Sequence, residues 1–225
     1  MTSNQDKVSM HNNSNDRRGG QHIQILGAML GLLSLSLLAT SASAGDADRG
    51  KELSATCAAC HGADGNSVNP EWPSLAGQHR TYLVRSIKSF RDGGRENVLM
   101  SPQAAALSDQ DIDDLAAYFS AQTPQRRAAD PALVSQGERL YRGGDRDKGV
   151  SACIACHGAT GFGNPGAGYP ALAGQHATYT ANQLMAYRAN TRQSDVSVNQ
   201  IMRNISALMS DEDIKAVSSY VQGLQ

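Results

Sequence analysis

The amino-acid sequence carries the pattern Cys-x-x-Cys-His twice, and the two copies together use all four cysteines of the chain. The first copy, CAACH, spans residues 57–61, and the second, CIACH, spans residues 153–157. Cysteine pairs at this spacing occur in redox dithiols, in zinc sites and in proteins that bind a cofactor through thioether bonds. Each copy therefore predicts a reactive or binding site built from two thiols and an imidazole.

The two copies belong to a longer internal duplication. The segments CAACHGADGN, WPSLAGQHRTYL and MSPQAAALSDQDIDDLAAYF return in the same order as CIACHGATGFGN, YPALAGQHATYT and MRNISALMSDEDIKAVSSYV. The offset is 96 residues at the cysteines, 97 at AGQH and 102 at the last segment, so a few loop residues are inserted in the second copy. Such periodic similarity sets the architecture. We predict one domain that has been duplicated and fused.

Residues 1–44 have the pattern of a secretory signal peptide. Two arginines precede the apolar run ILGAMLGLLSLSLLA at residues 25–39, and the small residues ASA at 42–44 form a cleavage site. A retained membrane anchor is the alternative, but this run is short for the roughly 20 residues that cross a bilayer. We expect a mature chain that begins at Gly45 and is exported to the periplasm.

A polar segment with two prolines at residues 123–131 separates the two copies and predicts a linker. We place an N-terminal domain at 45–125 and a C-terminal domain at 126–225. Strand patterns are nearly absent, so the expected fold class is all-α. Each domain is small and aromatic residues make up only 5% of the chain, so something besides side chains is expected to complete each core.

Three helices are predicted in each domain. The first runs into the first cysteine, and the second spans about 79–92 or 176–189, with apolar residues at helical spacing in the first copy. The third begins after a capping box, Ser108-x-x-Asp in the first copy and Ser210-x-x-Asp in the second.

Haem attachment explains the cysteine pattern best. Two thiols three residues apart at a helix end reach both vinyl groups of one haem, and the histidine that follows lies under the iron. A redox dithiol needs no histidine, and two cysteine pairs for one zinc would not lie in separate domains. We predict two covalently bound c-type haems, attached through Cys57, Cys60, Cys153 and Cys156. The predicted proximal iron ligands are His61 and His157.

The sixth iron ligand is predicted from the register of the repeat. Met100 is the only methionine of the first domain, and it lies eight residues before the helix cap Ser108. Met202 lies eight residues before Ser210, whereas Met209 falls opposite an apolar core position and Met185 has no methionine counterpart. We therefore predict Met100 and Met202 as the axial ligands opposite the histidines.

Other residues that recur in register receive structural roles. The backbone carbonyls of Pro73 and Pro170 are predicted to accept the second ring N–H of His61 and His157, since a metal-bound histidine is usually oriented in this way. His79 and His176 compete as iron ligands, but we expect partly exposed residues at helix starts. The aromatic residues expected to pack around the haem edges are Trp72, Tyr82, Tyr118, Tyr169, Tyr179 and Tyr220.

The chain resembles the dihaem cytochromes of the c4 type. The residues that carry the resemblance are the two CxxCH patterns, the WPSLAGQ and YPALAGQ segments, Met100 and Met202, and the segments DLAAYFSAQ and SSYVQGLQ. It covers essentially all of residues 45–225. The resemblance implies two class I cytochrome c domains related by a pseudo-twofold axis, His/Met iron in each, and electron delivery towards terminal oxidases.

The function that follows is periplasmic electron transfer, without an enzymatic reaction. Iron with both axial positions filled has no vacancy for oxygen or peroxide, which argues against a dihaem peroxidase or a haem-based sensor. A cytochrome subunit of a larger dehydrogenase remains the alternative. The expected partners are redox proteins: a donor such as a quinol–cytochrome c reductase and an acceptor such as a terminal oxidase. We expect a monomer, with loose peripheral membrane association left open.

Charge gives two further expectations. The net charge of −1 provides no attraction to nucleic acid, so none is expected as a partner. Residues 45–125 contain seven Lys/Arg against eleven Asp/Glu, net −4, and residues 126–225 contain ten against eight, net +2. We expect the two domains to face different partners and to hold different potentials, although two ordinary solvated surfaces would give the same counts.

Overall fold

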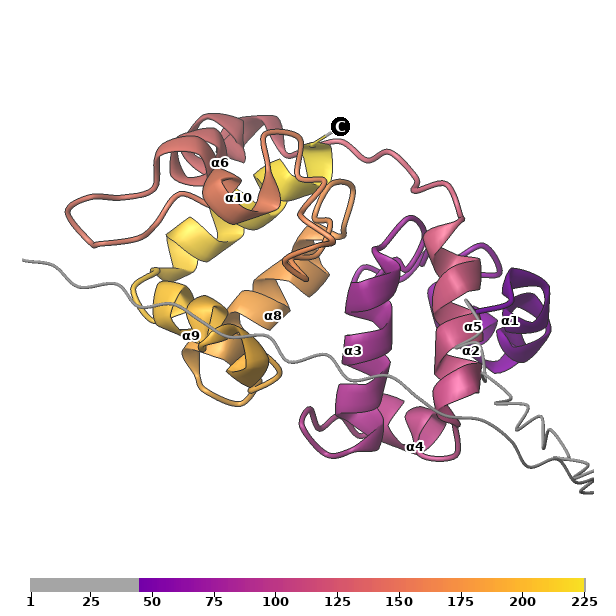
Figure 1. Cartoon of the computed structure of the whole chain (residues 1–225). Helices are drawn as coiled ribbons and strands as arrows, with labels where there is room; N and C mark the ends of the chain where they lie inside the picture. The colour runs from indigo at the N-terminus through magenta and orange to yellow at the C-terminus, as the bar shows by residue number, and fades with distance from the viewer. Residues whose placement is uncertain (1–44, 225) are drawn as a thin grey trace, which may run out of the picture. The chain divides into compact units, whose positions relative to one another are not determined.

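The computed structural model describes residues 45–224 of the chain (Figure 1). The predicted signal peptide, residues 1–44, lies outside this part. Between residues 45 and 224 no helix combines the length and the apolar character needed to cross a membrane.

The described residues are helical, which confirms the all-α prediction. They contain no β-strand, only isolated antiparallel bridges at Asp145–Val150 and Asn164–Tyr169. The helices are α1 (Ala47–Leu53), α2 (Ala55–His61), α3 (Arg80–Arg91), α4 (Met100–Ala104), α5 (Asp109–Ser120), α6 (Pro131–Gly143), α7 (Ile154–His157), α8 (Ala177–Arg188), the 3₁₀ helix η1 (Val196–Val198), α9 (Ile201–Ser206) and α10 (Asp211–Gly223).

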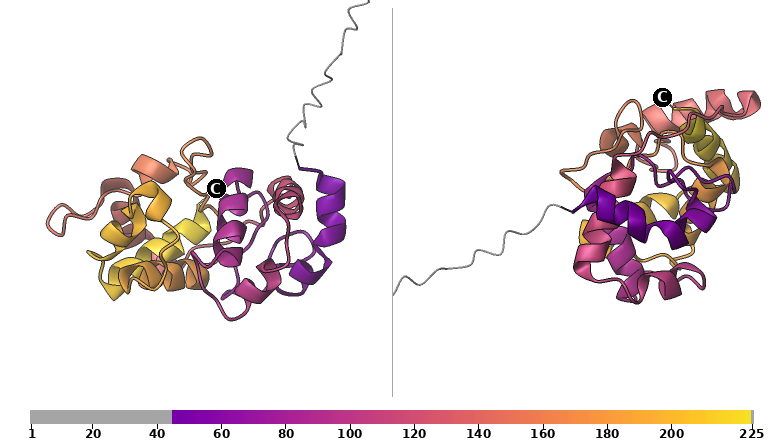
Figure 2. Two further views of the ribbon diagram at one scale, coloured as in Figure 1. Left: turned by 60° about the horizontal axis from the view of Figure 1, so that its bottom comes forward. Right: turned by 90° about the vertical axis from the view of Figure 1, so that its right-hand side faces the viewer.

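Helices α1–α5 and α6–α10 form two groups, each with its own apolar core (Figures 1 and 2). In the first half, α5 packs against α1 and α3, and α3 also contacts α4. In the second half, α10 packs against α6 and α8, and α8 also contacts α9. The matching contacts agree with a duplicated domain. The loop between the halves, residues 121–130, overlaps the predicted linker at 123–131 and begins two residues before it.

Local sequence signals placed the last two predicted helices of each half correctly. The capping boxes are formed at Ser108 before α5 and at Ser210 before α10, each with an aspartate at the third helical position. The observed α3 and α8 begin and end one residue inside the predicted ranges.

The predicted opening helix of the second half is wrong at its C-terminal end. Helix α6 stops at Gly143, ten residues before Cys153, and a short bridged loop follows it. Gly144 ends the helix with a φ of +69°, which favours glycine, and a Cβ there would lie 2.3 Å from the carbonyl oxygen of Val150. In the first half the helix is likewise divided in two at Ser54.

A glycine lies at the closest helix contact in each half. A Cβ on Gly50 in α1 would lie 2.0 Å from the carbonyl oxygen of Asp114 in α5. One on Gly137 in α6 would lie 2.3 Å from the carbonyl oxygen of Ala216 in α10. Only a residue without a side chain allows these backbones to approach so closely. The last helix of each half is held in this way against the first helix of the same half.

Candidate functional site

Each half presents its two cysteines and its histidine on one short helical segment. Cys57, Cys60 and His61 all lie in α2. In the second half Cys153 is the N-cap of α7, which contains Cys156 and His157. Residues three or four apart on a helix lie on the same face, so the two thiols of each pair point the same way. None of the four cysteines forms a disulfide bond.

The two histidines are buried and oriented by a proline carbonyl, as predicted. His61 and His157 are each 6% exposed. The Nδ1–H of His61 donates to the carbonyl oxygen of Pro73 at 2.8 Å, and that of His157 to Pro170 at 3.0 Å. A carbonyl can only accept, so Nδ1 carries the proton and Nε2 keeps its lone pair for a metal.

The protonation states favour a ligand role for these histidines. Burial lowers the pKa of both imidazoles, and the bonds to the carbonyls of Pro73 and Pro170 raise it only in part. The neutral form, which binds iron, is therefore favoured at neutral pH.

The environment of the cysteines disfavours the two other readings of the CxxC pattern. Burial raises the pKa of the Cys57 thiol and raises that of Cys153 to about 11. Redox-active dithiols instead have lowered thiol pKa values. Across residues 45–224, no three His, Cys, Asp or Glu side chains come together to hold a metal ion. Two thiols and an oriented neutral imidazole do fit a haem attached by thioether bonds.

The methionines predicted as axial ligands begin two short helices. Met100 is the first residue of α4, and Met202 is the second of α9. The Asn97 side chain accepts the backbone N–H of Met100 at 2.9 Å, which fixes the start of α4. Both methionines are half-buried, and Met202 packs against the same apolar cluster as Cys153. Their role as ligands stays a prediction.

The competing methionines behave as the repeat suggests. Met209 is 5% exposed and belongs to the core of the second half, as predicted from its alignment with an apolar position. Met185 lies on α8 and is exposed.

His79 and His176 begin helices α3 and α8, as predicted, but they are buried rather than partly exposed. Their Nε2 atoms contact carbonyls of the opposite half. His79 is bonded to the carbonyl oxygen of Phe162 at 2.6 Å, and His176 to that of Ser67 at 2.8 Å. The expectation of exposure was wrong because the other half covers each ring.

The glutamines next to these histidines also bridge the two halves. The Gln78 amide donates to the carbonyl oxygen of Ala171 and accepts from its N–H, at 2.9 and 3.0 Å. Gln175 makes the same pair of bonds with Ser74, both at 2.9 Å. The repeated AGQH segment therefore joins the halves, a role missed from sequence although the exact recurrence of these letters was a visible signal.

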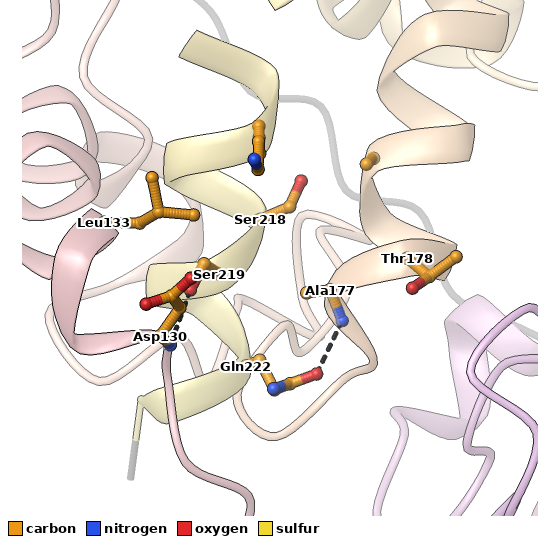
Figure 3. Close-up of a pocket in the computed structure, with 9 residues that line it drawn as sticks. Asp130, Leu133, Ala177, Thr178, Ser218, Ser219 and Gln222 are labelled. Carbon is orange, nitrogen blue, oxygen red and sulfur yellow. Dashed lines mark hydrogen bonds between the residues drawn. The ribbon is translucent and has the colours of Figure 1, made fainter. Parts of the chain in front are cut away.

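The pocket in Figure 3 lies apart from the predicted haem residues. It has a volume of about 330 Å³ and lies where the start of α6, α8 and α10 meet. Two bonds link its walls: Asp130 N–H to Ser219 Oγ at 2.9 Å, and Ala177 N–H to Gln222 Oε1 at 2.8 Å. None of the predicted cysteine, histidine or methionine ligands lines this pocket.

Comparison with known proteins agrees with this geometry. The cytochrome c family model matches residues 47–122 and 134–225. Cytochrome c4 of Pseudomonas aeruginosa is 48% identical, over 86% of this chain and 96% of its own. The thiosulfate dehydrogenase electron acceptor of Stutzerimonas stutzeri is 40% identical, over 73% and 76%. The crystal structure of reduced cytochrome c4 from Pseudomonas stutzeri superposes with a TM-score of 0.78 and 46% identity, over 81% of this chain and 100% of that one.

Proposed function

Because the chain belongs to the cytochrome c family and, within it, to the dihaem cytochromes of the c4 type, we propose that it shuttles single electrons between redox proteins of the periplasm. Membership makes the protein a dihaem electron-transfer cytochrome with two covalently bound c-type haems. The periplasmic location, the freely shuttling role and the absence of an enzymatic reaction are the parts that we add.

Eight residues hold the haems in this proposal. One haem is bound by Cys57 and Cys60, with His61 and Met100 on its iron. The other is bound by Cys153 and Cys156, with His157 and Met202. When bound, a c-type haem supplies an iron that changes by one electron between ferrous and ferric states. The observation that carries the assignment is the buried imidazole of each half, whose Nδ1–H is held by a proline carbonyl.

The chain's own residues explain why such sites would transfer electrons without binding a further ligand at the iron. The proline carbonyls fix the ring plane and the tautomer of His61 and His157. The lone pair of each Nε2 therefore has a fixed direction in which it would bind the iron. The thioethers of Met100 and Met202 would serve as sulfur ligands to the iron, and thioether ligation raises the reduction potential. The surrounding core excludes water and disfavours the extra positive charge of the ferric state, which raises the potential further.

The partners proposed for this carrier are redox proteins. A quinol–cytochrome c reductase as electron donor and a terminal oxidase as acceptor fit the function, and the chain acts as a monomer between them. The proposed domains are residues 45–125 and 126–225, preceded by a cleaved signal peptide at 1–44.

A second candidate function is suggested by one of the similar proteins. That relative is described as an electron acceptor of thiosulfate dehydrogenase, so a protein of this type can serve one dehydrogenase. This chain would then be the cytochrome partner of a larger oxidoreductase. Purification from native membranes and periplasm separates the two: a free carrier elutes alone, whereas a subunit co-purifies with a second protein.

The decisive experiment is an absorption spectrum of the dithionite-reduced, mature protein before and after addition of carbon monoxide, with haem counted per chain. Two haems and an unchanged spectrum are expected, because His and Met fill both irons. A carbon monoxide shift in either haem would reveal a vacant position, and would replace the carrier proposal with a peroxidase or a sensor.

A further inference from the structure

Two arginines each donate a hydrogen bond to a tyrosine of the opposite half of the chain. The Nη2 of Arg192, in the second half, donates to the Tyr82 hydroxyl at 2.9 Å. The Nη2 of Arg95, in the first half, donates to the Tyr179 hydroxyl at 3.3 Å. Both guanidiniums also donate to the side-chain oxygen of Gln183, each at 2.7 Å. We call these five residues the arginine–tyrosine cluster.

The cluster repeats the internal symmetry of the chain. The two arginines are 97 residues apart, and so are the two tyrosines, the same offset as the AGQH segments. Each arginine also lies over an aromatic ring of its own half. Arg192 lies 4.5 Å from the ring centre of Tyr187, and Arg95 lies 4.4 Å from that of Phe90. Equivalent side chains of the two halves therefore meet around Gln183.

The cluster is rich in positive charge and short of negative charge. Arg192 is only 6% exposed and Arg95 is half-buried. Within residues 45–224, no carboxylate lies within ion-pair distance of Arg95, Arg192 or the adjacent Arg85. Buried cations without a counter-charge are strongly unfavourable, so an anion is expected at this place.

A nearby pair of arginines provides the contrast. Arg91 and Arg188 are also 97 residues apart, and each forms an ion pair with an aspartate, Asp109 and Asp211 respectively. Of these two pairs, the one whose arginines bond to the other half, Arg95 and Arg192, lacks such a partner among residues 45–224.

The excess of positive charge also affects the pKa of the Tyr82 hydroxyl. Burial raises the pKa of this phenol, but the facing guanidiniums of Arg192, Arg95 and Arg85 lower it overall, to about 8. The surrounding charges therefore favour an anion even on a group that is ordinarily neutral.

The helices that carry the two tyrosines, α3 and α8, contribute to the cores against which the cysteines pack. Leu83, next to Tyr82 on α3, belongs to the core cluster against which Cys57 packs. Leu184, next to Gln183 on α8, belongs to the core cluster against which Cys153 and Met202 pack. A haem has its vinyl groups, which bind the cysteines, on one edge of the ring and its two carboxylates on the opposite edge. These carboxylates are the anions that the chain itself lacks.

We propose that Arg95 and Arg192 together neutralise the carboxylates of both haems, so that the reduction potential of each haem depends on an arginine of the opposite half. This inference rests on the proposed haem sites. A fixed positive charge disfavours the ferric state, which has one more positive charge than the ferrous state, and so raises the potential of each haem. The two arginines are positioning residues that tune both sites and are not iron ligands.

The test is spectroelectrochemical titration of both haems in the full haem-loaded chain. Arg192→Gln is expected to lower both potentials, by roughly tenfold in each equilibrium constant for reduction, about 59 mV for one electron. Arg192→Lys keeps the charge and should keep most of both potentials. Arg146→Gln, at an exposed site, removes the same charge elsewhere and should leave both nearly unchanged.

A second measurement, the pKa of Tyr82, leaves both arginines unaltered. In the haem-loaded protein, the Tyr82 phenol should ionise well above pH 8, because the haem carboxylates balance the arginines. It is followed by isotope-labelled tyrosine NMR, with Tyr82→Phe used to assign the signal. Ionisation near pH 8 would mean that no anion occupies the cluster, and would overturn the inference.

The outcomes separate this inference from the function on which it rests. If the unaltered protein binds no haem, the proposed function fails. If two haems are bound and Arg192→Gln moves neither potential, or only that of its own half, the function stands and the inference is wrong. A purely structural role would lower stability in Arg192→Gln and leave both potentials in place.

Discussion

At the scale of single residues, Met202 and Met209 show how position decides the use of one side-chain type. They lie seven residues apart, and both contact the core of the second half. Met209 is almost fully buried by apolar neighbours, whereas Met202 is half-buried at the start of α9. This difference in burial agrees with the prediction that Met202 is an iron ligand and Met209 a core residue.

We predict that Met202→Ala opens one iron and leaves the other unchanged. Removing the thioether takes away a ligand that raises the potential, so one of two haems should bind carbon monoxide and its potential should fall. The measurement is carbon monoxide titration of the reduced variant. Met209→Leu is the control, because this volume-conserving change costs at most about 1.5 kcal/mol and should create no carbon monoxide site. Binding of carbon monoxide in Met209→Leu would mean that Met209, and not Met202, is the iron ligand.

Asp114 is a second residue whose surroundings determine its behaviour. Its side chain is fully buried in α5 and accepts from the backbone N–H of Asp46 at 2.7 Å, from Gln110 at 2.7 Å and from Arg49. Burial raises the pKa of this carboxyl, but these three donors lower it overall below its usual value.

We therefore predict acid-dependent stability at this position. A carboxyl with a lowered folded-state pKa contributes stability above its unfolded pKa, about 3.9, and loses it as the pH falls through the folded pKa. Asp114→Asn should lower the free energy of unfolding at pH 7 by about 2 kcal/mol. The difference from the unaltered protein should shrink as the pH falls below 4 in urea titrations. Asp109→Asn, on an exposed ion pair, should have a much smaller effect. A pH-independent difference would contradict this account.

At the scale of elements, the halves are held together internally by helices that touch at glycine. The α1–α5 and α6–α10 contacts both rely on a glycine at the point of closest approach. In the second half, a side chain on Gly137 would meet both the backbone of Ala216 and the side chain of Tyr220. The pairing of first and last helices therefore depends on shape as much as on apolar area.

Gly137→Ala is predicted to destabilise the second half by about 1–3 kcal/mol, since the added methyl forces the two backbones apart. Gly143→Ala is the matched control on the same helix, because no atom lies within 4 Å of a Cβ placed there. That control should be neutral or stabilising, as alanine favours helix over glycine by about 1 kcal/mol. Thermal unfolding of both variants is the measurement, and equal losses in both would refute the role of the close contact.

At the scale of the whole molecule, the two halves are joined by hydrogen bonds but differ in charge. The glutamine and histidine of each AGQH segment form hydrogen bonds with backbone groups of the opposite half. The predicted domains nevertheless carry net charges of −4 and +2. One surface can therefore attract a basic partner while the other attracts an acidic one.

If each half serves its own partner, added salt should slow electron exchange with both an acidic and a basic redox protein. Opposite charges attract in both encounters, and salt screens that attraction. The measurement is stopped-flow electron exchange at several ionic strengths. If only the total charge of residues 45–225 mattered, which is −2, salt would slow the basic partner and speed the acidic one, and the two-partner expectation would be wrong.

Much of this protein follows from its sequence by itself, because the decisive signals are local. The CxxCH spacing, the capping boxes before α5 and α10 and the register of the duplication depend on residues within a few positions of each other, or on direct repetition. The last two predicted helices of each half, the family and the two haems could be inferred in this way. Even the proline carbonyls that orient His61 and His157 lie only 12 and 13 residues away.

The tertiary structure decided what distant residues do to one another. His79 and His176 are buried because carbonyls 83 and 109 residues away cover them, and no local pattern encodes such a contact. Likewise, Arg192 meets Tyr82 across 110 residues of chain, which places a buried cation where its own half has no carboxylate to pair with it. Burial and charge balance are properties of the folded neighbourhood, whereas helix starts and cofactor attachment depend on the neighbouring residues in the chain.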